Sequence, residues 1–265
     1  MLVLPTGSGK TRTAVYFLLH DMVSRGYQVV WLAHRYMLLE QAEDVFRNNA
    51  PLAKYDEFSD KKPMRIITVS GTHRSTHEMS RKDTIKIIGV QSAARNLAHL
   101  RSTLGEKVIV VIDEAHHSIA PSYQKIVDAV MKKRPDAKLL GLTATPVRMT
   151  KSGSRVLMNM FSNTVIYTQT MKDLIIGGYL AEPICTRVYT NENFESGLTE
   201  EEMNFIIKRH DMPESLVARI AASSARNKLI VDTYLKSREK YGKTLIFAMN
   251  IPHCTRFAKN SANTA

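Results

Sequence analysis

Two short stretches of this sequence contain residue types suited to phosphate chemistry. The first is PTGSGKT, Pro5 to Thr11, which follows the apolar residues LVL. The second is DEAHH, Asp113 to His117, which follows the apolar run VIVVI. The first stretch offers glycines, a lysine and a hydroxyl group, and the second offers two adjacent carboxylates. From such groups proteins build sites for a nucleotide and its magnesium ion.

The glycine-rich stretch fits a phosphate loop between a strand and a helix. Gly7 and Gly9 let the backbone turn tightly and bring its amides close to phosphate oxygens, and the following helix points its positive end at the same anion. Lys10 can reach the outer phosphates and the Thr11 hydroxyl can bind Mg²⁺. The general pattern has a glycine where this chain has Leu4. We predict that ATP and Mg²⁺ are bound by Pro5, Thr6, Gly7, Ser8, Gly9, Lys10, Thr11 and Arg12.

The acidic stretch is expected to meet this loop, because ligands of an open parallel sheet bind at the carboxyl ends of its strands. Asp113 can hold the magnesium ion, directly or through water, and Glu114 can orient and deprotonate an attacking water. The alternative is an acidic loop that caps the next helix, which needs only one carboxylate. His116 and His117 have no third ligand at a suitable spacing, so we do not predict a zinc site.

Short apolar runs alternate with amphipathic stretches up to Thr150, which predicts an α/β fold with a mostly parallel open sheet flanked by helices. We expect strands at MLVL, QVVWL, RIITV, TIKIIGV, VIVVID and KLLGL, and helices over Lys10–Ser24, Tyr36–Asn48 and Pro121–Lys133. Further along we expect strands at VIYT, PICTRVYT and GKTLIFAMN, a helix over Met171–Ile176, and a mostly helical, charged stretch over 192–240.

The charge balance favours a polyanionic partner. Lys and Arg number 37 against 25 Asp and Glu, a formal net charge of +12. The alternative is a solvated basic surface with no partner. The motifs described below favour a polyanionic partner over this alternative. Cys185 and Cys254 match no metal or redox spacing and indicate reduced thiols. There is no secretion signal and no apolar run of the ~20 residues that span a bilayer, so we expect no membrane partner and a cytoplasmic, nucleoid or nuclear location.

The order of the motifs resembles that of superfamily 2 helicases and translocases. PTGSGKT, AHR followed by LLEQ, VQS, DEAHH and LTATP occur in sequence over residues 4–146. This arrangement is similar to the first of the two RecA-like lobes of that family, which are P-loop NTPases. The doubled histidine resembles the branch with DNA-repair helicases and type III restriction subunits rather than the RNA-unwinding DEAD-box branch.

The resemblance implies a role for each site residue. Lys10, Asp113, Glu114 and His116 would be catalytic, and His116, Thr143 and Thr145 would couple the ATP site to nucleic acid, with DNA expected rather than RNA. The residues implied to bind nucleic acid are Arg35, Gly71, Thr72, Gln91 and Ser92. From the residues alone, Arg35 can also be a surface charge, and Gln91 can be a hydrogen-bonding residue at a helix start.

The resemblance also implies a division of the chain. Residues 1–190 would form the ATP-binding lobe, 191–240 a helical connector, and 241–265 the truncated start of a second lobe. We therefore expect an ATP-dependent helicase or translocase with weak or no unwinding alone, completed by a chain that supplies the second lobe. A binding module without turnover is the alternative. A P-loop ATPase with no nucleic-acid partner is disfavoured by the basic surplus and by AHR and TATP.

Overall fold

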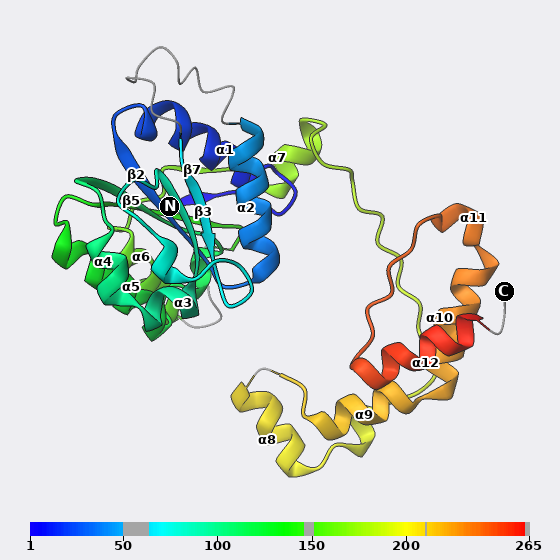
Figure 1. The fold of residues 1–265 in the computed structure, drawn as a ribbon. Coiled ribbons are helices and arrows are strands. Elements are labelled where there is room, and N and C mark those ends of the chain that lie inside the picture. Colours follow the sequence, from blue (N-terminus) through cyan, green and yellow to red (C-terminus); the bar gives the residue numbers. More distant parts are fainter. Residues whose placement is uncertain (50–63, 146–150, 210, 263–265) are drawn as a thin grey trace. The chain divides into compact units, whose positions relative to one another are not determined.

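The computed structural model describes residues 1–49, 64–145, 151–209 and 211–262 (Figure 1). The chain forms two compact units, Met1–Pro183 and Ile184–Ala265, which are considered separately below. No helix in the described ranges is long and apolar enough to cross a membrane.

The first unit is built on a seven-stranded sheet. The strand order is β3-β4-β2-β5-β6-β1-β7, and every strand pair is parallel. This arrangement confirms the predicted open parallel sheet. The strands are β1 (Leu2–Val3), β2 (Tyr27–Ala33), β3 (Ile66–Val69), β4 (Ile85–Gly89), β5 (Lys107–Ile112), β6 (Lys138–Thr143) and β7 (Tyr167–Thr168).

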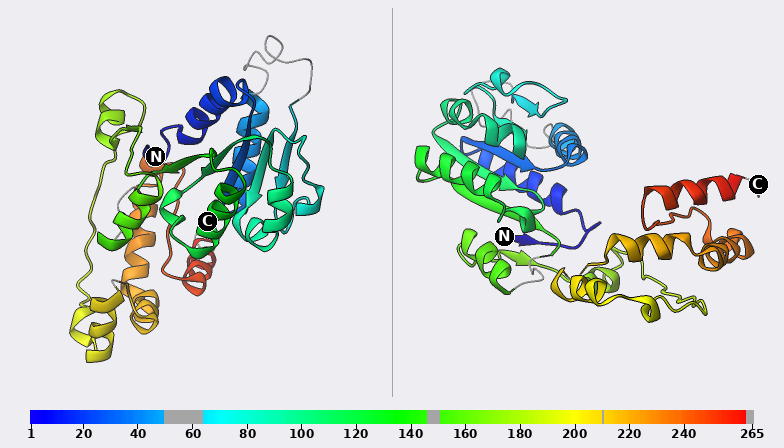
Figure 2. Two further views of the ribbon diagram at one scale, coloured as in Figure 1. Left: turned by 90° about the vertical axis from the view of Figure 1, so that its left-hand side faces the viewer. Right: turned by 90° about the horizontal axis from the view of Figure 1, so that it is seen from below.

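Helices cover both faces of this sheet (Figures 1 and 2). Trp31 and its neighbours on one face pack against α1 and α2, while Leu32 and its neighbours on the other face pack against α3 to α6. Both faces of a strand are then buried, which explains why the strands are apolar without alternation. The helices are α1 (Lys10–Phe17), continued by the π-helix η1 (Leu18–Val23), α2 (Tyr36–Asn49), α3 (Val90–Arg95), α4 (Leu97–Ser102), α5 (Pro121–Lys133), α6 (Lys151–Met160) and α7 (Met171–Ile176).

The second unit is mainly helical, as predicted for residues 192–240. Its helices are α8 (Glu200–Arg209), α9 (Glu214–Ala222), α10 (Ser224–Lys236), α11 (Arg238–Tyr241) and α12 (Ile251–Ala262).

Two predicted strands are wrong. The stretch PICTRVYT at 183–190 and the stretch GKTLIFAMN at 242–250 contain no strand. Leu245 and Phe247 are 77% and 87% exposed, so the apolar side chains of the second stretch contact little. A strand needs a neighbour that pairs with its backbone, and neither stretch finds one among the described residues.

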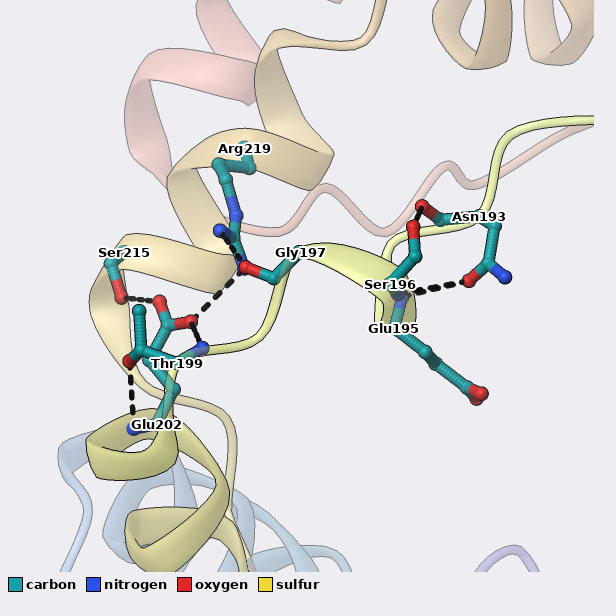
Figure 3. Close-up of polar contacts among 8 residues, drawn as sticks. All are labelled: Asn193, Glu195, Ser196, Gly197, Thr199, Glu202, Ser215 and Arg219. Atoms are coloured by element: carbon teal, nitrogen blue, oxygen red, sulfur yellow. Dashed lines mark hydrogen bonds and ion pairs between the residues drawn. The ribbon is translucent and has the colours of Figure 1, made fainter.

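A cluster around Glu202 holds the turn before α8 against α9 (Figure 3). Thr199 and Glu202 form a reciprocal cap: the Thr199 N–H donates to Glu202 Oε2 at 3.0 Å, and the Glu202 N–H donates to Thr199 Oγ1 at 3.2 Å. From α9, Ser215 donates to the same carboxylate, and Arg219 donates to Glu202 Oε2 at 3.2 Å and to the Gly197 carbonyl at 2.6 Å. These hydrogen bonds, led by the one from Ser215, lower the pKa of Glu202.

A buried lysine lies at the opposite end of the first unit's sheet from the phosphate loop. Lys86 on β4 is fully buried, and its Nζ donates to the Thr103 carbonyl at 2.6 Å. Burial lowers the pKa of Lys86 to about 8, and the nearby Asp83 opposes this shift. The lysine therefore ties β4 to the end of α4 while holding a charge that burial disfavours.

We expect Glu202→Gln to loosen the second unit. The amide keeps the size of the carboxylate but loses its charge, so its hydrogen bonds to Ser215 and Arg219 weaken. Amide hydrogen exchange should show reduced protection over residues 199–219, whereas the exposed neighbour variant Glu201→Gln should behave like the wild type. Because the pKa of Glu202 is lowered by folding, its contribution is present above the ordinary Glu pKa and is lost as the pH falls through the folded value. Equal protection in both variants would contradict this role.

We expect the stability of the first unit to depend on pH through Lys86. Between pH 8 and the ordinary lysine value of 10.5, the unfolded chain binds a proton that the folded chain has released. The free energy of unfolding should therefore rise with pH across this window, relative to Lys86→Met. Urea unfolding followed by the fluorescence of Trp31, the one tryptophan of the chain, measures this difference. A difference that does not change with pH would show that Lys86 has an ordinary pKa.

Candidate functional site

The phosphate loop lies where β1 passes into α1. Gly7 and Gly9 adopt left-handed backbone angles, with φ of 83° and 81°, which favour glycine. Ser8 closes the turn on Pro5, since its hydroxyl donates to the Pro5 carbonyl at 2.6 Å and its N–H donates to the same oxygen at 3.2 Å. The loop therefore has the tight turn that its sequence predicts, at the carboxyl edge of the sheet.

The acidic stretch begins where β5 ends and lies against this loop. The Asp113 N–H donates to the Leu32 carbonyl of β2 at 2.9 Å, and Asp113 is 3% exposed. Lys10 Nζ lies 3.2 Å from Glu114 Oε1, so the phosphate loop and the acidic stretch meet as predicted. Glu114 has a φ of 50°, a left-handed conformation that is unusual for a residue with a side chain. Backbone strain of this kind is concentrated at functional sites.

Burial changes the proton affinity of the Asp113 carboxyl group. It raises the pKa of Asp113 to about 6, although Lys10 and the N–H of Glu114 favour the charged form. A divalent cation beside the carboxylate would favour ionisation much more strongly. The Asp113 carboxyl group is thus a group whose ionised form a bound cation would stabilise.

One cavity of about 380 Å³ joins the phosphate loop to the acidic stretch. Thr11 and Asp113 both line it, and a hydroxyl and a carboxylate oxygen are ligands that Mg²⁺ accepts together with phosphate and water oxygens. The described residues contain no cluster of three or more His, Cys, Asp or Glu side chains that could hold a metal by itself. The full lining is Pro5, Thr6, Gly7, Gly9, Lys10, Thr11, Arg12, Leu38, Gln41, Val45, Asp113 and Glu114.

Three of these lining residues were missed by the sequence analysis. Leu38, Gln41 and Val45 come from α2 and form one wall of the cavity. Their spacing places them on one face of that helix, but spacing alone cannot tell which face looks toward the loop. The predicted residue Ser8 does not line the cavity and instead shapes the turn.

His116 connects the acidic stretch to the end of β6. Its Nδ1 lies 3.2 Å from Glu114 Oε2 and 3.1 Å from Thr143 Oγ1. The Thr143 hydroxyl in turn accepts the Thr145 N–H at 3.1 Å. The three residues expected to couple the two sites are therefore in one hydrogen-bonded group with Glu114. Pro146, the last residue of the LTATP motif, lies outside the described residues.

A second cavity, of about 350 Å³, adjoins the first. The ring of His117 lies between those of His34 and His116, with centroids 4.3 Å and 4.2 Å apart. Burial and the neighbouring His117 lower the pKa of His34. The lining of this cavity is Thr6, His34, Arg35, Leu38, Glu114, His116, His117, Ala144 and Thr145.

The residues expected to bind nucleic acid all follow strand ends at this same edge. Arg35 is exposed at the start of α2, after β2. Gly71 and Thr72 are exposed in the loop after β3, and the next residue of that loop, His73, stacks on Tyr36 with ring centroids 4.5 Å apart.

Gln91 is exposed on α3 and Ser92 is half-buried there, directly after β4. The alternative interpretation of Gln91, a hydrogen bond that caps the helix, is not observed among the described residues. The Gln91 side chain is therefore available to a ligand.

Comparison with known proteins agrees with this geometry. Residues 1–148 match the family described as type III restriction enzyme, res subunit. The chain is 27% identical over 164 residues to "Putative ATP-dependent helicase IRC3" of Saccharomyces cerevisiae, and 26% identical over 176 residues to "Putative helicase 22" of a Sulfolobus islandicus filamentous virus. The first alignment covers 59% of this chain and 22% of the relative, and the second covers 64% and 28%.

Among solved structures, the helicase domain of Pyrococcus furiosus Hef superposes with a TM-score of 0.54 at 19% identity, over 89% of this chain and 50% of that one. This similarity shows a shared RecA-like α/β fold. The family match covers more than half of the 265 residues and includes both the phosphate loop and the acidic stretch. The chain therefore belongs to the type III restriction enzyme res subunit family, a helicase-type branch of superfamily 2.

Proposed function

We propose that this chain is the ATP-binding lobe of an ATP-dependent helicase or translocase that acts on nucleic acid, with DNA as the expected substrate rather than RNA. The observation that carries the proposal is the contact of Lys10 with Glu114 at 3.2 Å, inside a cavity that Thr11 and Asp113 also line. A lysine suited to phosphate, a hydroxyl and a carboxylate suited to Mg²⁺, and a candidate base thus lie around one space, which supports the proposal.

The proposed roles follow from this arrangement. The amides around Gly7 and Gly9 and the Lys10 ammonium group would bind the phosphates, and Thr11 and Asp113 would hold Mg²⁺, which supplies charge neutralisation at the phosphates. Glu114 would accept the proton of the attacking water. His116 would connect Glu114 to Thr143 and Thr145 and so to the nucleic-acid face.

The ion pair between Lys10 and Glu114 suggests how the site responds to ATP. The lysine contacts the candidate base, and a phosphate group would compete for it. When Lys10 moves to the phosphate, the Glu114 carboxylate loses a partner that holds it in place. The carboxylate oxygen that Lys10 released can then face the attacking water and accept its proton.

The proposed nucleic-acid face consists of Arg35, Gly71, Thr72, Gln91 and Ser92. Its support is the position of these residues at the edge that also holds the phosphate loop, together with the formal net charge of +12. Arg35 and the phosphate-loop residue Thr6 line the same cavity, so the two proposed sites adjoin each other.

A second candidate function is a nucleotide- and nucleic-acid-binding module without turnover. The ion pair itself favours it, because a base held by Lys10 and His116 is not free to act. The curated relatives are also much longer than this chain, which spans 22% and 28% of their lengths. In both cases we propose that a second RecA-like lobe, supplied by further sequence or by a partner chain, completes the site. The division into residues 1–190, 191–240 and 241–265 belongs to this proposal.

We expect DNA-stimulated ATPase activity that depends on Glu114. Glu114→Gln preserves the shape of the side chain but removes the proton acceptor, so turnover should fall by about 100-fold or more while binding of Mg-ATP persists. The matched control is Glu106→Gln, an exposed glutamate just before β5, at the other end of that strand. Steady-state hydrolysis with and without single-stranded DNA, and binding of a fluorescent ATP analogue, measure the two quantities. Binding without turnover in the wild type would select the binding module, and loss of both would reject the nucleotide site.

We expect Arg35→Ala to weaken DNA binding through the loss of one phosphate contact. The slope of log Kd against log salt concentration should decrease by about 0.7 for single-stranded DNA. Arg25→Ala is the matched control, because Arg25 is exposed just before the start of β2 whereas Arg35 follows its end. Fluorescence anisotropy at several salt concentrations provides the slopes. Identical slopes in the two variants would remove Arg35 from the nucleic-acid face.

A further inference from the structure

A third cavity, of about 470 Å³, lies beyond the histidine pair and is not used by the proposed chemistry. It shares His34 and His117 with the cavity that Arg35 lines. Its size falls in the range of small-molecule sites. The lining residues are His34, Val90, Gln91, His117, Ile119, Ala120, Ser122 and Tyr123.

Two polar groups of this lining have no partner among the described residues. Tyr123 is 3% exposed, and its hydroxyl makes no hydrogen bond there. The Nδ1 atom of His34 is also buried without a partner. A buried hydroxyl left unpaired reduces the stability of the fold, so such a group calls for an explanation. These groups indicate a ligand that supplies the missing hydrogen bonds.

The chemistry of the lining restricts that ligand. No Asp, Glu, Lys or Arg side chain is among the lining residues, so the cavity suits a neutral group. The side chains of Val90, Ile119 and Ala120 offer flat apolar contacts, and the imidazoles of His34 and His117 offer ring faces or edges. The amide of Gln91 and the hydroxyl of Tyr123 can each donate and accept. A neutral planar heterocycle with donors and acceptors along its edge satisfies all of these conditions.

We propose that this cavity takes one unstacked base of a nucleic-acid strand that lies along the face defined by Arg35 and Gln91. The inference rests on the proposed function and adds base contacts to its phosphate contacts. Bases displaced from their stack are commonly held by aromatic rings and by hydrogen bonds to their edges. Gln91 lines the cavity and belongs to the proposed face, so one strand can place a phosphate near Arg35 and a base here.

The position of the cavity also links a bound base to the nucleotide site. The His117 ring in its wall lies 4.2 Å from the ring of His116, and His116 Nδ1 lies 3.2 Å from Glu114 Oε2. A base against His117 would therefore be two side chains away from the candidate catalytic carboxylate. The binding of an accessible base in this cavity would therefore be linked to the nucleotide site through His117 and His116.

The test compares an intact strand with a strand that has the same phosphates and no bases. The purified chain is titrated into fluorescein-labelled oligothymidylate of about 12 nucleotides, and into an abasic strand of equal length. The wild type should bind the intact strand at least about fivefold more tightly, the smallest gain expected for one stacked base. Tyr123→Phe should remove most of this preference without changing the affinity for the abasic strand.

Tyr123→Phe separates an effect on binding from an effect on folding, because it keeps the ring in the core and removes only a hydroxyl that makes no hydrogen bond to any residue the structure describes. Its thermal stability should equal or exceed that of the wild type. Tyr27→Phe is the matched control, because Tyr27 lies at the opposite end of β2 from the proposed face and should leave the preference unchanged.

Three results would overturn the inference. Equal affinity for intact and abasic strands would mean that only the backbone is bound, which leaves the proposed function standing. No binding of either strand would reject the nucleic-acid function as well. Binding of free thymidine more tightly than of the oligothymidylate would assign the cavity to a free nucleoside rather than to a base of a strand.

Discussion

The parallel arrangement of all strands is the constraint on which the rest of the first unit depends. When every strand points the same way, the carboxyl ends collect at one edge, and the loops that follow them must lie side by side there. The phosphate loop follows β1, Arg35 follows β2, Gly71 follows β3, Gln91 follows β4 and Asp113 follows β5. The direction of the strands thereby brings residues from distant parts of the chain to one edge of the sheet.

A few buried or half-buried charged side chains determine the electrostatic interactions at this edge. Lys10 is 8% exposed and Asp113 is 3% exposed, so water screens their interaction poorly. Lys10 pairs with Glu114 and also stabilises the ionised form of Asp113. A nucleotide and a metal ion would rearrange these pairings rather than enter a neutral pocket. The ion pairing observed at this edge and the proposed chemistry with nucleotide and metal therefore use the same three side chains.

Several unfavourable features of the first unit lie at this edge. Glu114 has a left-handed backbone, the carboxyl group of Asp113 is buried, and the Tyr123 hydroxyl makes no hydrogen bond within the described part of the chain. Each of these features reduces stability by itself, and together they surround the three adjoining cavities. At the other end of the sheet the charge of buried Lys86 is accompanied by a hydrogen bond to Thr103. The contrast fits a structural role for Lys86 and a ligand-binding role for the opposite edge.

The sequence by itself determined the fold class and the phosphate loop. Both can be predicted from the residues of a short stretch alone. A strand buried on both faces is apolar throughout, and Gly7 and Gly9 take backbone angles that other residues avoid. It also determined that Asp113 and Glu114 meet the loop, because parallel topology leaves no other edge. The sequence failed at 183–190 and 242–250, where apolar character resembled strands but a strand exists only when a neighbour pairs with it.

Only the tertiary structure decided which helix faces line the site and which side chains share a cavity. Leu38, Gln41 and Val45 lie on a helix whose orientation is set by packing, since Leu39 and Phe46 of the same helix fill the core against Trp31. The edge-to-face contact of His34 with His117, and the Tyr123 hydroxyl without a partner among the described residues, involve residues from β2, η5 (Ala115–His117) and α5 or their flanks. Local propensity determines which elements form, whereas contacts between side chains far apart in sequence depend on how those elements pack.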